Sequence, residues 1–149
     1  MLGFGDKGVE FFRMINPIEH SRTKDSANKY KVEPYVMPAD VYGQGNLSGR
    51  GGWTWYTGSS SWMYEAGIKY ILGLNIVKDF LRMKPCIPKD WKEYSIKYRY
   101  GSSIYNINVK NENGKNTGVE KFIVNGEEIP DKQLKLNKMG GIYHIDIIM

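Results

Sequence analysis

The sequence has one cysteine, two histidines and no long apolar run. Cys86 alone excludes an internal disulfide, which is typical of proteins from reducing compartments. His20 and His144 lie far apart in the sequence, so no metal site is indicated. No apolar stretch approaches the roughly 18 residues of a membrane helix. The N-terminus lacks a basic start followed by an apolar run, so we expect no signal peptide, no membrane association and a cytoplasmic location.

Blocks of one charge are also lacking. The net charge is +5 and the isoelectric point is about 9.2. The lysines are spread along the chain, and no Lys/Arg-rich block appears. This pattern favours a solvated basic surface over a nucleic-acid interface, so we expect no nucleic-acid partner.

Aromatic residues are what the chain does have. They make up 13% of 149 residues, with 11 tyrosines and 4 tryptophans. The length fits one domain or two small units. Sugar-binding proteins use such rings, because pyranoses stack their C–H faces on aromatic faces while their hydroxyls contact polar neighbours.

The first part of the chain has helical periodicity. DKGVEFFRMI places Val9 and Phe12 on one face, with Asp6 as the expected N-cap. The Asn16-Pro17 pair ends this helix, because a residue before proline avoids the α region. Residues 20–31 are polar and fit a loop or a short helix. Residues 32–52 carry two prolines and five glycines, which indicates a long irregular loop of the kind that is often functional.

Residues 59–72 have the pattern of a second helix, apolar on most faces. Two rows of side chains recur at a spacing of four, and Gly73 stands where a C-terminal cap belongs. We therefore expect a mostly buried helix. The two rows are Trp62, Ala66 and Tyr70, and Met63, Gly67 and Ile71.

After Leu74 the pattern becomes that of β-strands. Residues 74–85 fit either a helix or a hairpin turning at Lys78-Asp79; the strands that follow favour the hairpin. EYSIKYRYG and SIYNINVKN alternate, Asn125-Gly126 is a hairpin signal, and QLKLN and GIYHIDIIM close the chain as strands. We expect an antiparallel sheet of five to seven strands, and hence an α+β chain divided into residues 1–73 and 74–149.

The segment GGWTWYTGSSSWMYEAG, residues 51–67, combines rings with small hydroxyl residues. Trp53, Trp55 and Tyr56 precede Thr57-Gly58, and serines form the expected first helical turn. A helix N-terminus exposes free N–H groups and a partial positive charge, which suits an oxyanion such as phosphate. The alternative is structural: Ser59 or Ser60 is an N-cap and Gly58 a turn residue.

Five motifs in order resemble the C-terminal part of glycoside hydrolase family 94. They are NPIEHSRT, YKVEPYVMPADVYG, GRGGWTWYTGSSSWMY, YILGL and KPCIPKDW followed by YSIKYRYGSSIYNI, over residues 9–110. The family includes cellobiose and chitobiose phosphorylases and the phosphorylase-like end of cyclic β-1,2-glucan synthases. The resemblance implies the last helices of an (α/α)6 barrel followed by a small antiparallel β-domain.

The resemblance implies inverting phosphorolysis of a β-glucoside. In that reaction a carboxylic acid protonates the glycosidic oxygen, and inorganic phosphate, the co-substrate, attacks from the opposite face. No further cofactor is implied. Thr57 and Gly58 match the family's phosphate contacts, and Ser59 adjoins them. Glu33 and Tyr35 match a stretch near the family's sugar site, and Trp53, Trp55 and Tyr56 match its aromatic approach to the phosphate contacts. These are candidate substrate contacts; the alternatives are a structural ion pair or hydrogen bond for Glu33 and barrel packing for the three rings. Arg50 lies between glycines and either contacts an anion or braces the loop, and His20 is expected to be structural.

The resemblance also implies what this stretch lacks. The family's general acid and its histidine and arginine phosphate ligands correspond to positions before residue 1, and Asp40 stands in a different motif. We expect no catalytic residue here, an inactive fragment or subunit, and self-association or pairing with the missing barrel portion. The alternative is a stand-alone, non-catalytic module that binds carbohydrate or another protein.

Overall fold

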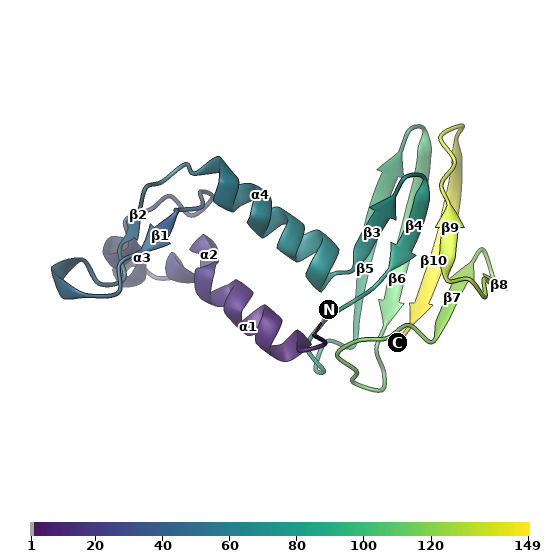
Figure 1. Ribbon diagram of the computed structural model, residues 1–149, viewed down its shortest axis with the longest axis horizontal. Helices are drawn as coiled ribbons and strands as arrows, with labels where there is room; N and C mark the ends of the chain where they lie inside the picture. Colours follow the sequence, from purple (N-terminus) through teal and green to yellow (C-terminus); the bar gives the residue numbers. More distant parts are fainter. Residues whose placement is uncertain (1) are drawn as a thin grey trace. The chain divides into compact units, whose positions relative to one another are not determined.

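The computed structural model describes residues 2–149, which form two compact units. Unit 1 comprises the residues up to Val9 together with Ile68–Met149, and unit 2 comprises Glu10–Gly67. Helices and strands are both present, as an α+β chain requires (Figure 1). Among residues 2–149, no helix is both long enough and apolar enough to cross a bilayer.

Unit 2 holds short helices and one short hairpin. Helix α1 (Gly5–Ile15) starts in unit 1 and ends in unit 2 directly before Asn16, as expected from the Asn-Pro pair. Asn16 then caps α2 (Pro17–His20), since its side chain accepts a hydrogen bond from Ile18 N. The polar segment expected as a loop or short helix contains α3 (Lys24–Tyr30), which has a capping box.

The expectation that Asp6 is the N-cap of the first helix is wrong. Helix α1 already includes Gly5, and Asp6 lies in its first turn. The Asp6 carboxylate instead accepts hydrogen bonds from Lys89 N at 3.0 Å and from Asn116 Nδ2 at 2.9 Å. Asp6 therefore anchors the start of α1 to two loops of the same unit.

The expected long loop contains a two-stranded antiparallel sheet. Strand β1 (Asp40–Val41) pairs with β2 (Gly51–Gly52), with the single helical turn η1 (Gly45–Leu47) between them. Gly51 must be glycine, because a Cβ there would lie 2.3 Å from Val32 Cγ2 and 3.2 Å from Tyr30 Cε2. A small buried cluster of Tyr30, Val32 and Val36 supports this hairpin.

The second long helix differs from the expectation in its start and its burial. Helix α4 (Thr57–Glu65) begins two residues earlier than expected and continues into a π-helical turn (Ala66–Ile71). It has no buried residue, and Trp62 and Tyr64 are 69% and 72% exposed. Nothing in residues 2–149 covers these rings, so the expected burial is wrong. An apolar helical pattern predicts an apolar face, but it does not identify the segment or partner that packs on that face.

Unit 1 contains two sheets that share one core. The three-stranded sheet has the order β3-β4-β9, and the five-stranded sheet has the order β5-β6-β10-β7-β8. Buried residues of β4, β6, β7 and β10 form one cluster. The strands are β3 (Leu74–Val77), β4 (Phe80–Met83), β5 (Glu93–Tyr100), β6 (Ser103–Lys110), β7 (Lys121–Val124), β8 (Glu127–Glu128), β9 (Gln133–Lys135) and β10 (Gly141–Ile148).

Both hairpin turns predicted from the sequence are confirmed. Lys78 and Asp79 join β3 to β4, and Asn125-Gly126 joins β7 to β8. Asn125 and Gly126 have φ of 50° and 91°, as a type I′ turn requires at both central positions. The short-range turn chemistry of Asn125-Gly126 therefore sets the register of the β7–β8 hairpin.

The predicted single antiparallel sheet needs two corrections. The strands divide into two sheets, and β10 pairs with β6 in parallel, while the other ladders are antiparallel. The parallel register places Tyr143 beside Tyr105, and their rings stack with centroids 4.7 Å apart. Alternation shows which face a side chain takes but not the direction of the neighbouring strand.

Candidate functional site

Two neighbouring tryptophans in unit 2 have an unusual backbone. Trp53 and Trp55 have φ of 49° and 62°, in the left-handed region that bulky residues rarely occupy. Their side chains are 77% and 65% exposed. Such conformations cost free energy and occur mostly at ligand sites. Both indoles are mostly exposed, so burial of the side chains does not offset the strain.

Backbone hydrogen bonds hold this strained segment on both sides. Ala39 N donates to the carbonyls of Gly52 and Trp53, each at 3.2 Å. Tyr56 N donates to Met37 O at 3.3 Å. Backbone hydrogen bonds to segment 37–39 therefore hold residues 52–56 in place. Sequence reasoning missed the role of Met37 and Ala39, because backbone pairing leaves no side-chain signal.

The exposed rings form two pairs, which we call the aromatic platform: Tyr35, Trp53, Trp55 and Tyr56. Tyr35 meets Trp55 edge to face with ring centroids 6.1 Å apart, and Trp53 lies 5.6 Å from Tyr56 at a tilt of 38°. The indole Nε1 of Trp55 donates to Glu33 Oε1 at 3.3 Å. The structure thus brings Tyr35, Trp55 and Glu33 together in one group, and Trp53 and Tyr56 in another.

The platform adjoins the N-terminus of α4. Tyr56 is the N-cap residue, and no side chain caps the helix. The first intrahelical bond runs from Ser60 N to Tyr56 O at 3.3 Å, so the amides of Thr57, Gly58 and Ser59 precede it. The alternative of Ser59 or Ser60 as N-cap is wrong. Three early amides and the helix dipole can receive an oxyanion here, with the exposed Thr57 hydroxyl beside them.

Arg50 and His20 have different places in unit 2. Arg50 is exposed, and no ion pair or side-chain hydrogen bond of its guanidinium occurs among residues 2–149. Its carbonyl accepts from Tyr42 N at 2.9 Å, which braces the β1–β2 hairpin. His20 Nε2 lies 2.6 Å from Met14 O, and its ring stacks on Tyr30 at 4.6 Å, so its contacts are structural.

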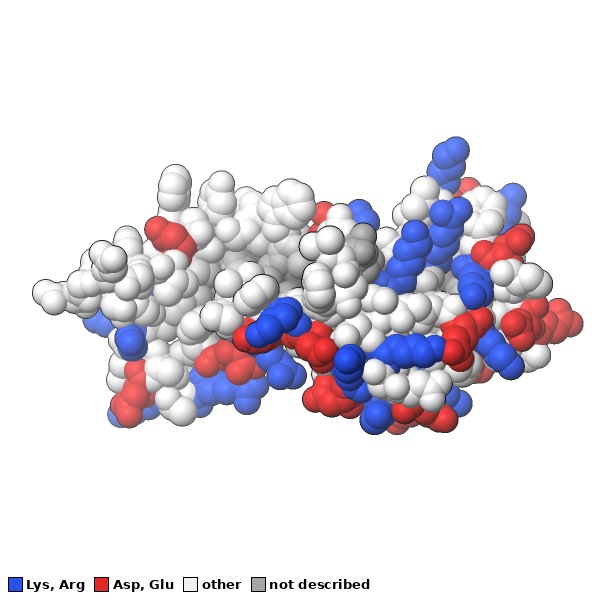
Figure 2. All heavy atoms as spheres, turned by 60° about the horizontal axis from the view of Figure 1, so that its bottom comes forward, with Lys and Arg blue, Asp and Glu red and all other residues white. Residues whose placement is uncertain are grey.

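Charge is unevenly spread over the unit that carries the platform. In Figure 2 the upper part of unit 2 is mostly uncharged, and Lys, Arg, Asp and Glu gather along its lower edge.

Tyr30 has a buried hydroxyl without a hydrogen-bond partner, and burial raises its pKa. Within residues 2–149, no group of three or more His, Cys, Asp or Glu converges as a metal site would require.

Several known proteins are similar to this chain in sequence. The chain is 46% identical over 101 residues to a cyclic beta-(1,2)-glucan synthase of Rhizobium meliloti, covering 68% of this chain and 4% of that protein. It is 34% identical over 129 residues to the N,N'-diacetylchitobiose phosphorylase of Vibrio furnissii, covering 86% of this chain and 16% of that protein. A solabiose phosphorylase of Paenibacillus borealis is 30% identical over 128 residues.

These relatives are a glucan synthase and two phosphorylases. Residues 1–73 match the family described as the glycosyl hydrolase 94 superfamily, catalytic domain. Residues 1–73, just under half of the chain, therefore belong to that superfamily, and the resemblance drawn from the motifs is confirmed. The chain spans only a small part of the relatives' length, 4% of the synthase and 16% of the phosphorylases.

Proposed function

We propose that this chain is the C-terminal part of an inverting glycoside phosphorylase, or of the phosphorylase-like region of a glucan synthase. In that enzyme it supplies one side of the phosphate site and a stacking surface for a β-linked glucoside. The observation that carries the proposal is the joining of the two features: the aromatic platform leads directly into the uncapped N-terminus of α4.

The proposed phosphate contacts are Thr57, Gly58 and Ser59. Phosphate oxygens accept hydrogen bonds from early amides of α4 and from the Thr57 hydroxyl, and the helix dipole favours the negative charge. A phosphate held in this way attacks the anomeric carbon while an acid protonates the glycosidic oxygen, so that the C–O bond breaks and a sugar 1-phosphate forms. Phosphate is already anionic and needs no second carboxylate as a base.

The proposed sugar contacts are the platform rings with Glu33 and Arg50 at its border. Exposed aromatic faces stack on the apolar faces of pyranoses. Glu33 is partly engaged by Trp55, and its carboxylate can also accept a sugar hydroxyl. The exposed guanidinium of Arg50 can donate to hydroxyls or to an anion.

The general acid is not proposed among these residues. Asp6 is engaged by Lys89 and Asn116, and Asp40 belongs to the β1 strand. We therefore expect that the 149-residue chain alone releases no sugar 1-phosphate above the buffer rate, because acid catalysis of leaving-group departure contributes about 10²–10⁴-fold. We also expect self-association through the exposed rings of α4, measured by light scattering.

A chimera tests the proposal. Residues 1–73 replace the matching segment of the Vibrio furnissii phosphorylase, and phosphorolysis of N,N'-diacetylchitobiose is measured against phosphate concentration. Retained activity with a raised KM for phosphate in Thr57→Ala, and not in Ser61→Ala, supports the assignment. An active chimera whose phosphate KM ignores Thr57→Ala contradicts it.

A second candidate is a stand-alone carbohydrate-binding module. The exposure of the platform rings favours it, because these rings can stack on a glucan without any phosphate. The two candidates differ in one observable: the module binds cellobiose or β-1,2-glucan identically with and without phosphate, whereas the enzyme fragment binds phosphate at α4.

A further inference from the structure

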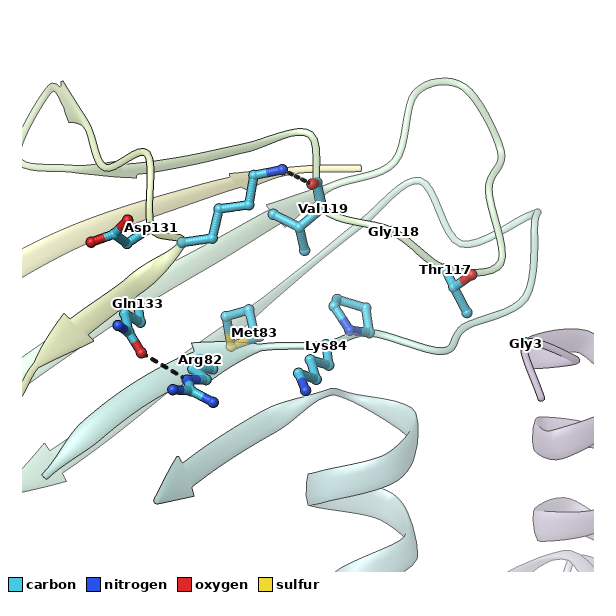
Figure 3. Close-up of a pocket in the computed structure, with 11 residues that line it drawn as sticks. Gly3, Arg82, Met83, Lys84, Thr117, Gly118, Val119, Asp131 and Gln133 are labelled. Carbon is cyan, nitrogen blue, oxygen red and sulfur yellow. Dashed lines mark hydrogen bonds between the residues drawn. The ribbon is translucent and has the colours of Figure 1, made fainter. Parts of the chain in front are cut away.

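Unit 1 contains a polar cavity that no part of the proposed reaction uses. Its volume is about 710 Å³, within the roughly 300–1,000 Å³ range of small-molecule pockets. It lies between the end of β4, segment 117–119 and residues 131–133, the last of which begins β9 (Figure 3). The three segments are far apart in sequence, so the sheet topology assembles the cavity.

One edge of the cavity carries two cations from one stretch of chain. Arg82 lies in β4 and Lys84 directly follows the last residue of that strand, Met83; both cations are exposed, whereas Leu81 and Met83 are buried in the core. Arg82 Nε donates to Gln133 Oε1 at 2.9 Å (Figure 3). This bond orients the guanidinium and leaves its two terminal nitrogens for another acceptor, a geometry suited to bidentate contact with an oxyanion.

The other edge adds a third cation together with groups for hydroxyls. Lys132 Nζ donates to Val119 O at 2.7 Å, which ties the turn to segment 117–119. The Asp131 carboxylate and the Thr117 hydroxyl also line the cavity. Three cations against one carboxylate make the cavity electropositive. The carboxylate can accept a hydrogen bond from a ligand hydroxyl, a contact that an anion without hydroxyls would not use.

We propose that this cavity binds a small hydroxylated anion, either a sugar phosphate or a sugar acid. The anionic group contacts Arg82 and Lys84, and the hydroxyls contact Asp131, Thr117 and the amide of Gln133. The net positive charge of the cavity excludes a simple cation as its ligand. A neutral sugar has no anionic group for the Arg82 guanidinium to bind. The inference does not rest on the proposed function, because none of these residues belongs to unit 2.

The test is a ¹⁵N NMR titration of the full chain with glucose 6-phosphate, glucuronate, glucose and inorganic phosphate. We expect saturable shifts of amides in segments 82–84, 117–119 and 131–133 with one or both anions, and binding of glucose weaker by about tenfold or more. The stronger of the two anions identifies the source as a sugar phosphate or a sugar acid. Added salt weakens the binding, because the cations are at the surface.

Variants make the test specific. The double variant Arg82→Gln/Lys84→Gln is expected to weaken anion binding by about tenfold or more. The matched control Lys97→Gln/Arg99→Gln removes the same charge from exposed positions of β5 outside the cavity and is expected to leave binding unchanged. Thr57→Ala is also expected to leave it unchanged, which separates this site from the phosphate site.

Three results would overturn the proposal. The first is the absence of saturable shifts in the three segments with either anion. The second is an equal loss of binding in the cavity variant and in the β5 control, which would reduce the effect to net charge. The third is inorganic phosphate binding as tightly as glucose 6-phosphate, which would leave no role for the hydroxyl contacts.

Discussion

The indole of Trp55 donates its Nε1 hydrogen to Oε1 of Glu33, 22 residues earlier, over 3.3 Å. The bond joins the long loop of unit 2 to the segment that leads into α4. It also fixes the orientation of a ring whose backbone has φ of 62°. Glu33 therefore has a role that its sequence context alone did not supply: it positions Trp55.

Removing the Glu33 acceptor should loosen the platform. We expect Glu33→Ala to lower the affinity for cellobiose by about threefold to tenfold, because the Trp55 ring loses its hydrogen-bond partner. Glu33→Gln keeps an acceptor oxygen and should retain most of the affinity. Isothermal titration measures both, with Glu127→Ala on the remote β7–β8 hairpin as control. Equal affinities for Glu33→Ala and the wild type would refute the positioning role.

At Trp53, whose backbone is left-handed, glycine should give a more stable protein than alanine, whereas in a helix alanine is the more stable of the two. We expect Trp53→Gly to be more stable than Trp53→Ala by about 1 kcal/mol, because alanine retains the left-handed penalty and glycine does not. At Trp62, an exposed helical position, the free energy of unfolding of Trp62→Ala should exceed that of Trp62→Gly by about 1 kcal/mol. Urea unfolding of the four variants measures both differences. If the alanine variant were the more stable one at both positions, the backbone of residue 53 would not be strained.

Two glycines of α1 should respond in opposite directions to alanine. A Cβ on Gly5 would lie 2.1 Å from Ile87 O, whereas nothing lies within 4 Å of a Cβ on Gly8. We expect Gly5→Ala to destabilise unit 1 by about 1–3 kcal/mol through overpacking, and Gly8→Ala to stabilise the helix by about 1 kcal/mol. Thermal unfolding followed by circular dichroism measures both changes. Stabilisation by Gly5→Ala would show that α1 does not begin against Ile87.

The anchor at Asp6 predicts a pH-dependent stability. Hydrogen bonds, first from Asn116 and then from the Lys89 amide, hold the pKa of Asp6 below its ordinary value. A depressed carboxyl pKa stabilises the fold above the unfolded pKa of about 3.9, and the effect is lost as the pH falls through the folded pKa. Asp6→Asn should therefore lower the melting temperature at neutral pH and converge with the wild type in acid.

The control for this prediction is Asp90→Asn, an exposed carboxylate of unit 1 for which the structure provides no comparable pair of hydrogen bonds. It should follow the wild type across the same pH range. If the gap between Asp6→Asn and the wild type stayed constant down to the acid limit, the contribution of Asp6 would not come from its charged form.

Much of unit 1 could be predicted from the sequence, since alternation marks strands and turn residues mark hairpins. The turn at Asn125-Gly126 needs positive φ at both positions, which these two residue types tolerate, so the sequence and the structure agree. The parallel neighbour of β10 could not be predicted, because the side-chain period is the same for either direction of pairing. Strand order depends on packing between distant segments.

The candidate site divides in the same way. The residue types of the platform stand together in the sequence, so Trp53, Trp55 and Tyr56 could be predicted as a group. Their left-handed backbone could not, because tertiary hydrogen bonds from Ala39 and to Met37 impose it against the local preference. The exposure of Trp62 could not be predicted either, because its apolar helical pattern is also that of a buried helix.

The most direct test of the central claim is a phosphate titration of this chain, followed by NMR at the amides of Thr57, Gly58 and Ser59. We predict saturable shifts at these three amides, weakened by Thr57→Ala and left unchanged by Ser61→Ala, which removes a hydroxyl from the same helix away from its first amides. Phosphate shifts that are absent from α4, or that are equal in the two variants, would contradict the assignment of a phosphate site to this helix.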